Sequence, residues 1–248
     1  MAGHSRWANI KHKKGAADKR RSALFTKLVK EIYVAAKVGG PNPDSNPRLR
    51  LAVQNARGQS VPSDNINRAI NKASGAGGES FSDVMYEAYG PGNVGIIIEC
   101  TTDNLNRTIA NLRTYFNKVE GSLATNGSLN FVFDQKGVFE FTMPEGMDED
   151  TLTLELIDGG ADEVEVDDTF VSTSCAREDF GSLSKKLDEL GITPQKSGLQ
   201  YVPKIFKQIN KEDAAKFAKL IDNLDADDDV KTFYHNVEFS EEIAEILN

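Results

Sequence analysis

Residues 89–119, YGPGNVGIIIECTTDNLNRTIANLRTYFNKV, decide how the middle of the chain folds. The apolar run over residues 94–98 predicts a central strand that is buried on both faces. The glycine- and proline-rich turn at residues 90–93 joins it to an earlier strand at residues 86–89, as in a hairpin. Apolar side chains then recur at helical spacing and predict an amphipathic helix that stops at Gly121. They are Leu105, Ile109, Leu112, Phe116 and Val119.

The segment that follows alternates strands and helices. We predict a hairpin over residues 131–141 around the turn Asp134-Gln135-Lys136-Gly137, a helix near residues 148–158, strands at 164–166 and 170–175, a helix carrying Phe180, Leu183, Leu187 and Leu190, and a strand near 200–202. From Val138 onward the order is strand, helix, strand, strand, helix, strand, which is typical of a ferredoxin-like unit. A later helix and strand, at residues 214–224 and 233–239, are expected either to complete the sheet begun at 84–130 or to stand apart. The pattern alone leaves this open.

The N-terminal part is predicted to be helical behind a basic arm. Residues 1–17 have no apolar period, and the first helix is expected to begin near Asp18 and end at Gly39-Gly40. Asn46 and Pro47 predict the cap and first turn of a second helix. A third helix is expected to be capped by Ser63 or Asp64.

Charge is divided unevenly along the chain. Residues 1–72 carry 15 Lys and Arg against 4 Asp and Glu, a net charge of +11, whereas residues 73–248 carry 14 against 34, a net charge of −20. An asymmetry of this size indicates that the basic part binds a polyanion. The alternative is a basic part that docks on the acidic remainder of the same chain.

The residues predicted to contact nucleic acid lie on the arm and on the polar faces of the three helices. Each phosphate contact neutralises one charge and releases counterions, so such a surface needs basic side chains with few acids between them. Ordinary solvated helix faces are the alternative. Trp7 is expected either to stack on an exposed base or to dock the arm by hydrophobic contact. The candidates are Trp7, Lys11, Lys13, Lys14, Lys19, Arg20, Arg21, Lys27, Lys30, Arg50, Arg57, Arg68 and Lys72.

No catalytic or metal-binding motif is evident in the sequence. The HExxH, Walker and GxSxG patterns are absent. His235 lies on an apolar strand face, which favours a core histidine over a ligand. The acidic run at Asp225, Asp227, Asp228 and Asp229 lacks the glycine and glutamate of an EF-hand loop and is predicted to be a solvated loop.

The cysteine content and hydropathy favour a cytoplasmic protein. The two cysteines, Cys100 and Cys175, lie far apart and neither belongs to a CxxC motif, which favours a reducing compartment. No apolar run approaches the length of about 18 residues that a membrane-spanning helix needs. The polar, basic N-terminus is unlike a secretory signal.

Several stretches resemble the YebC/PmpR family. The opening, MAGHSRWANIKHKKGAADKRRSALFTKLVKEI, is the most specific of them. NPRLRLAVQNAR (46–57), PSDNINRAI (62–70), YGPGNVGIIIECTTDNLNRT (89–108) and GSLNFVFDQKG (127–137) agree with it. The resemblance covers essentially the whole chain, and it departs from the family pattern at Ala88 and Asn93, where glycines are expected.

The resemblance implies an α+β fold of three domains: an N-terminal three-helix domain and two α/β (ferredoxin-like) domains, the third inserted in the second. We therefore expect a basic flexible arm at residues 1–22, a basic helical domain at 23–78, an acidic α/β domain made of 79–130 and 205–248, and an inserted domain at 131–204. It also implies a cytoplasmic location, no cofactor, no metal and no enzymatic activity.

Two functions are implied by the family. One is transcription regulation through binding of promoter DNA. The other is a role in translation, in which the protein binds RNA at the ribosome and relieves stalling at difficult sequences such as proline runs. Two further hypotheses are an enzyme with a site between the acidic domains and an adaptor whose basic part binds an acidic protein. A carboxylate pocket with shifted pKa values would favour the enzyme.

Overall fold

The computed structural model describes residues 14–75 and 80–247. Trp7, Lys11 and Lys13, three of the predicted nucleic-acid-binding residues, lie outside the described residues. The chain divides into two units: residues 28–75 and 135–200 form one, and residues 14–27, 80–134 and 201–247 form the other. No helix in the described ranges is both long and apolar enough to cross a membrane.

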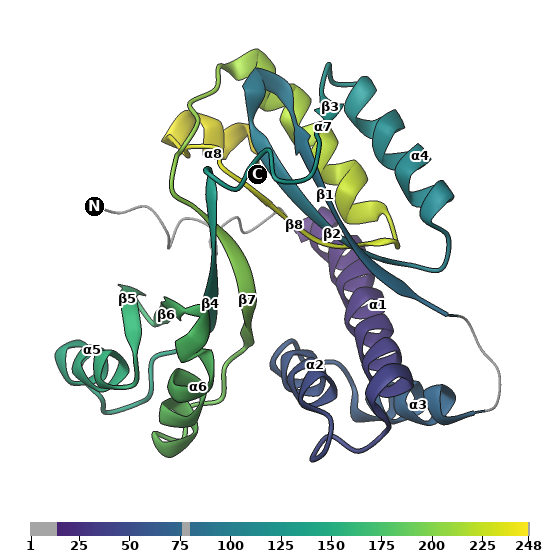
Figure 1. The fold of residues 1–248 in the computed structure, drawn as a ribbon. Helices are drawn as coiled ribbons and strands as arrows, with labels where there is room; N and C mark the ends of the chain where they lie inside the picture. The colour runs from purple at the N-terminus through teal and green to yellow at the C-terminus, as the bar shows by residue number, and fades with distance from the viewer. Residues whose placement is uncertain (1–13, 76–79, 248) are drawn as a thin grey trace. The chain divides into compact units, whose positions relative to one another are not determined.

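Three helices make up the N-terminal part (Figure 1): α1 Lys14–Gly39, α2 Pro47–Gly58 and α3 Ser63–Ser74. Helix α1 begins before the predicted start at Asp18, because Ala16 and Ala17 are strong helix formers that extend it. Residues 14–22 of the predicted arm are therefore helical. The predicted stop is confirmed: α1 ends at Gly39, and Gly40 has a left-handed backbone with φ 91°.

Asn46 links the beginning of α2 to the end of α1. Its side-chain oxygen accepts a hydrogen bond from the Leu49 amide at 3.1 Å, which caps α2 and confirms the prediction. Its Nδ2 donates to the carbonyls of Ala35 and Gly40, each at 2.8 Å. A single buried side chain thus fixes the angle at which the chain turns from one helix into the next.

The cap predicted for α3 was wrong. The helix does begin at Ser63, but its N-cap is Pro62, which makes no side-chain cap hydrogen bond. Val61 is buried, and the proline ring fixes the backbone that leads out of this buried position. The helix therefore starts directly after the proline, without a polar cap.

The second domain is built on a sheet with strand order β3-β1-β2-β8. Its elements are β1 Ser82–Tyr89, a short 3-10 turn η2 Pro91–Asn93, β2 Gly95–Thr102, α4 Leu105–Asn117, β3 Ser122–Leu123, α7 Lys211–Ala226, β8 Val230–His235 and α8 Glu241–Leu247. Strand β2 pairs antiparallel with both β1 and β8, which confirms the predicted central strand and its hairpin. Asn93, found where the family pattern has glycine, has a φ of 58°, and asparagine tolerates this left-handed backbone better than most side chains do.

Both faces of this sheet are covered within the same unit. On one face, α4 and α7 contribute Phe116 and Phe217 to a core shared with Ile96 and Ile98 of β2. On the other face, Ile97 packs in a smaller cluster with Leu129, Val132 and Phe133. This is why the part of the chain that enters β2, residues 94–98, lacks polar side chains.

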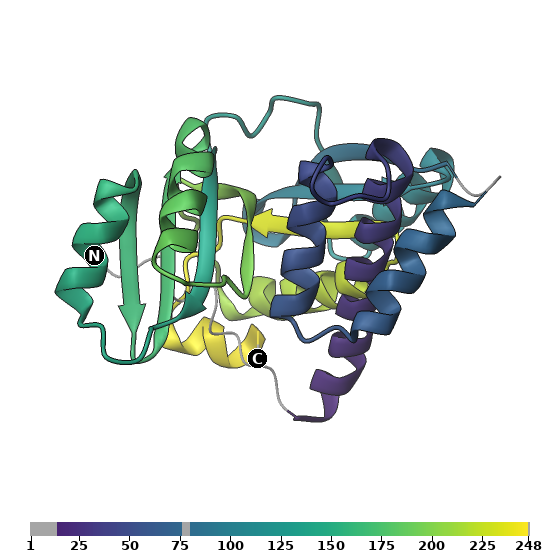
Figure 2. The same ribbon diagram turned by 90° about the horizontal axis from the view of Figure 1, so that it is seen from below.

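The inserted domain is a second sheet with strand order β5-β6-β4-β7. Its elements are β4 Phe133–Thr142, α5 Glu149–Asp158, β5 Ala161–Asp167, β6 Phe170–Ala176, a 3-10 turn η3 Arg177–Asp179, α6 Phe180–Glu189 and β7 Lys196–Pro203. Helices α5 and α6 lie side by side on one face of it (Figures 1 and 2), where Leu152 and Leu183 join its core. The predicted strand and helix order is confirmed. Because β8 joins β2, the later segment completes the first sheet, and this domain is an insertion.

The predicted hairpin around Gly137 was wrong. Residues 133–142 form one continuous strand, which pairs with β6 over its whole second half. Gly137 occurs there because the ring of Phe180 packs on the strand: a Cβ at position 137 would lie 2.7 Å from that ring and 2.8 Å from Cys175 Sγ. The glycine thus permits a close approach within a strand and does not mark a turn.

Candidate nucleic-acid interface

Helices α2 and α3 present the clearest basic surface in the described chain. Arg57 on α2 and Arg68 on α3 are exposed, and the structure gives neither side chain a hydrogen bond or ion pair in residues 14–75 and 80–247. The two helices contain one acidic residue, Asp64. The sequence prediction that these side chains point away from the core is confirmed, whereas their role in binding is a proposal.

Arg50 and Lys72 are also exposed but are held by neighbouring groups. The Arg50 guanidinium donates to the carbonyls of Pro43 and Asp44, at 3.1 and 2.7 Å. Lys72 Nζ lies 5.5 Å from the centroid of the Tyr33 ring. Carbonyls and an aromatic ring orient these side chains without neutralising them. Arg48, in contrast, forms a bidentate pair with Glu31 at 2.8 and 3.2 Å.

Helix α1 carries the remaining candidates. The exposed Arg21 guanidinium lies 5.4 Å from the centroid of the Phe25 ring, one helical turn further on. Lys30 is partly buried. The backbone of Lys14, Lys19 and Arg20 is helical, but their side chains are not among those described.

Lys27 does not extend along an exposed basic face as expected. Its Nζ donates to the carbonyl of Leu224 at 3.4 Å, in the last turn of α7. Burial lowers the pKa of Lys27, and the nearby carboxylates of Asp225, Asp227 and Asp228 oppose that shift. The structure therefore assigns this lysine an intramolecular contact that the helical spacing did not reveal.

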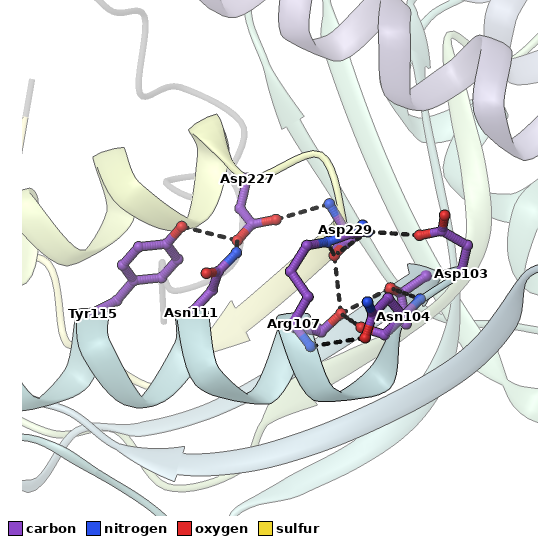
Figure 3. A network of polar contacts seen from close by, with 9 residues as sticks. Asp103, Asn104, Arg107, Asn111, Tyr115, Asp227 and Asp229 are labelled. Carbon is purple, nitrogen blue, oxygen red and sulfur yellow. Dashed lines mark hydrogen bonds and ion pairs between the residues drawn. The ribbon is translucent and has the colours of Figure 1, made fainter.

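The acidic run at residues 225–229 is not the solvated loop that the sequence predicted. Asp227 and Asp229 are buried, at 8% and 4% exposure. Figure 3 shows that both point toward α4. The Arg107 guanidinium donates to Asp229 from Nε at 3.0 Å and from Nη2 at 2.7 and 2.8 Å.

Asp227 is held by a second set of donors on the same helix. Tyr115 Oη donates to it at 2.9 Å and Asn111 Nδ2 at 3.2 Å. Burial, together with the hydrogen bond to Asp227, raises the pKa of Tyr115 to about 12. Asp227 also accepts from the backbone amide of Asp229 at 2.8 Å, so these residues form one network. The signal that could have revealed it is the spacing of Arg107, Asn111 and Tyr115, each one turn apart on α4.

His235 is a core residue, as predicted. It is buried, its ring lies 4.8 Å from that of Phe217 in an edge-on arrangement, and its Nδ1 accepts from the Val237 amide at 3.3 Å. Burial lowers its pKa to about 3. Within the described residues, no three His, Cys, Asp or Glu side chains are grouped so that they could hold a metal ion.

Comparison with known protein families identifies the family of this chain. The family described as "TACO1/YebC protein N-terminal domain" matches residues 5–76, and "TACO1/YebC second and third domain" matches residues 81–237. The chain belongs to the TACO1/YebC family. The TACO1/YebC descriptions divide the chain between the three helices and the two sheets, which agrees with the fold.

Relatives in the TACO1/YebC family are similar over their whole length. A protein of Amoebophilus asiaticus named "Probable transcriptional regulatory protein" is 48% identical over 96% of this chain and 98% of its own. A protein of Photobacterium profundum with the same description is 43% identical over the full length of both. The crystal structure of a conserved hypothetical protein from Aquifex aeolicus superposes with a TM-score of 0.82 at 37% identity, over 95% of this chain and 98% of that one.

Proposed function

We propose that the chain is a non-enzymatic, nucleic-acid-binding regulator of gene expression that acts in the cytoplasm. The names of its relatives support the regulatory role. The observation that carries nucleic-acid binding is the exposure of Arg57 and Arg68, which have no carboxylate partner in the described part of the chain, on helices that hold a single acid. Uncompensated guanidinium groups on a folded surface suit phosphate oxygens, which they can bind in bidentate geometry.

The proposed surface is better suited to contacts with the sugar-phosphate backbone of a nucleic acid than to hydrogen bonds with its bases. Arg50, Arg57, Arg68 and Lys72 are spread over two helices, and such contacts position a protein on nucleic acid without selecting a sequence. The other basic residues of α1 and the arm, together with Trp7, would extend the contact: Lys11, Lys13, Lys14, Lys19, Arg20, Arg21 and Lys30. A structured RNA and duplex DNA both present the phosphates that this surface needs.

The test is the salt dependence of binding by the full chain. We would measure anisotropy titrations with a labelled DNA duplex and a structured RNA between about 50 and 200 mM salt. Arg57→Gln combined with Arg68→Gln should weaken binding and reduce the slope of log K against log salt by about 2, one per phosphate contact. A matched control changes Arg113 and Lys118, exposed cations of the acidic domain, to Gln.

The salt dependence of the two variants decides whether the proposal holds. A steep slope that the surface variant reduces and the control does not would support the proposal. Absence of binding to both probes, or equal losses in both variants, would overturn it. Preference for the RNA would favour the translation role, with ribosomal RNA as partner, and preference for the duplex would favour promoter DNA.

A further inference from the structure

Helix α5 of the inserted domain is apolar on two opposite sides. Leu152 and Leu156 are fully buried in the core of the domain. Leu154 and Ile157, in contrast, are 69% and 54% exposed, and they lie one helical turn apart. A helix that covers a sheet normally presents polar side chains to solvent. In the described part of the chain, no other two exposed large apolar side chains stand one turn apart on a helix.

The outward side of α5 is centred on these two residues. Asp150 precedes Leu154 by four positions and Ile157 by seven, so the three side chains lie on the same side of the helix, away from Leu152. Neither Leu154 nor Ile157 belongs to the core of the inserted domain. We call Leu154 and Ile157 the apolar face of α5.

The segment that contains α5 is strongly acidic. Residues 144–176 contain 11 Asp and Glu and no Lys or Arg. Lys186 of α6 binds Glu155 and Asp158 of α5, each at 2.9 Å. Three exposed carboxylates have no ion pair in the described part of the chain: Glu145, Glu149 and Asp150. Such a surface attracts a cationic partner and repels a polyanion.

We infer that the apolar face of α5 binds a cationic amphipathic helix of a partner protein. Apolar side chains of the partner would pack on Leu154 and Ile157, which have the one-turn spacing that helix pairs use. Its lysine or arginine side chains would meet Glu149 and Asp150 at the rim, since protein interfaces combine an apolar centre with a polar edge. The inference does not rest on nucleic-acid binding, and it gives the acidic inserted domain a partner of its own.

The first test is binding of a model peptide to the full chain. The probe is a labelled helix of about 18 residues, with leucine on one side and lysine on the other, and binding is followed by fluorescence anisotropy. Leu154→Gln with Ile157→Gln should bind the peptide roughly ten times more weakly than the wild type, because central apolar contacts carry most of the affinity of an interface. The matched control, Val38→Gln with Leu105→Gln, removes two exposed apolar side chains elsewhere and should bind as the wild type does.

A second test examines the charge of the rim. Glu149→Gln with Asp150→Asn should weaken binding roughly three to ten times at about 50 mM salt, and the loss should shrink as salt rises. The control, Glu178→Gln with Asp188→Asn, makes the same change in net charge on exposed acids elsewhere in the inserted domain. A peptide with glutamate in place of lysine should not bind.

Losses confined to the α5 variants support the inference. Absence of binding, or equal losses in the variants and their controls, overturns it. Binding that appears only in Trp7→Ala would mean that the arm covers the apolar face, and a dimer that Leu154→Gln with Ile157→Gln dissociates in sedimentation would mean that a second copy covers it. Either result overturns the inference. No nucleic acid enters these measurements, so they decide the inference whether or not the proposed function holds.

Discussion

The side-chain amide of Asn55 pairs with the backbone of Ser197 in the way that a neighbouring strand would. Its Nδ2 donates to the Ser197 carbonyl and its Oδ1 accepts from the Ser197 amide, both at 2.8 Å. Close by, a Cβ at Gly58 would clash with the Gln195 carbonyl oxygen. The end of α2 thus lies against the chain that enters β7, and Asn55 binds both backbone groups of Ser197.

Asn55→Ala should therefore destabilise the protein. Both backbone groups of Ser197 lose their partner in a partly buried position, which costs about 1–3 kcal/mol of unfolding free energy. Urea denaturation followed by circular dichroism measures the change. Asn67→Ala, on the exposed face of α3, is the control and should be neutral or slightly stabilising, since alanine favours helix. Equal stability of Asn55→Ala and wild type would show that the pairing contributes nothing.

His235 should make the protein sensitive to mild acid. Its pKa is about 3 in the folded chain and about 6.5 when unfolded. Between these values the unfolded chain takes up a proton and the folded chain does not, so stability is lost as the pH falls below about 6.5.

The measurement compares the unfolding free energy at pH 7 and pH 5. The wild type should lose about 2 kcal/mol more than His235→Phe over this interval, because each pH unit below the unfolded pKa costs about 1.4 kcal/mol. Phenylalanine keeps a ring beside Phe217 and removes the titration. Identical losses in the two proteins would mean that His235 is protonated in the folded state.

Gly137→Ala should also destabilise the protein. The added methyl group meets the Phe180 ring and Cys175 Sγ at under 3 Å, and overpacking of this kind costs about 1–3 kcal/mol. Gly181→Ala in α6 is the control, since nothing lies within 4 Å of its Cβ position and alanine is the better helix former. Thermal unfolding of both variants decides: a Gly137→Ala protein as stable as the control would contradict the close packing.

Gly137 also shows where sequence reasoning reached its limit. Strand and helix order followed from apolar spacing, because each element buries one face and its period is local information. Glycine is needed at position 137 because the ring of Phe180, 43 residues later in the sequence, packs on the strand there. Glycine occurs both in turns and where another group packs closely against the backbone, and only the packing distinguishes the two cases.

The charged residues also divide into those whose surroundings followed from local sequence and those whose surroundings did not. Exposure of Arg57 and Arg68 followed from their place opposite an apolar stripe. Burial of Asp227 and Asp229 did not, because a run of aspartates is usually solvated and its partners, Arg107 and Tyr115, lie more than 100 positions earlier. The helical spacing placed Lys27 on the basic face, because its neighbour on α7, Leu224, lies 197 positions further along the sequence.

Arg107 provides a final prediction, because its Nη2 binds two carboxylates at the same distance of 2.7 Å but in different surroundings. The side chain of Asp229 is 5% exposed and that of Asp103 is 36% exposed. Asp103→Asn should cost under about 1 kcal/mol, as exposed ion pairs do. Asp229→Asn should cost about 3 kcal/mol, because it leaves Arg107 without its buried partner and places an amide beside the donors of Thr108 and Arg107. Urea denaturation of both variants and of Arg107→Gln separates the two pairs. Equal costs for the two aspartates would show that burial does not set the strength of this network.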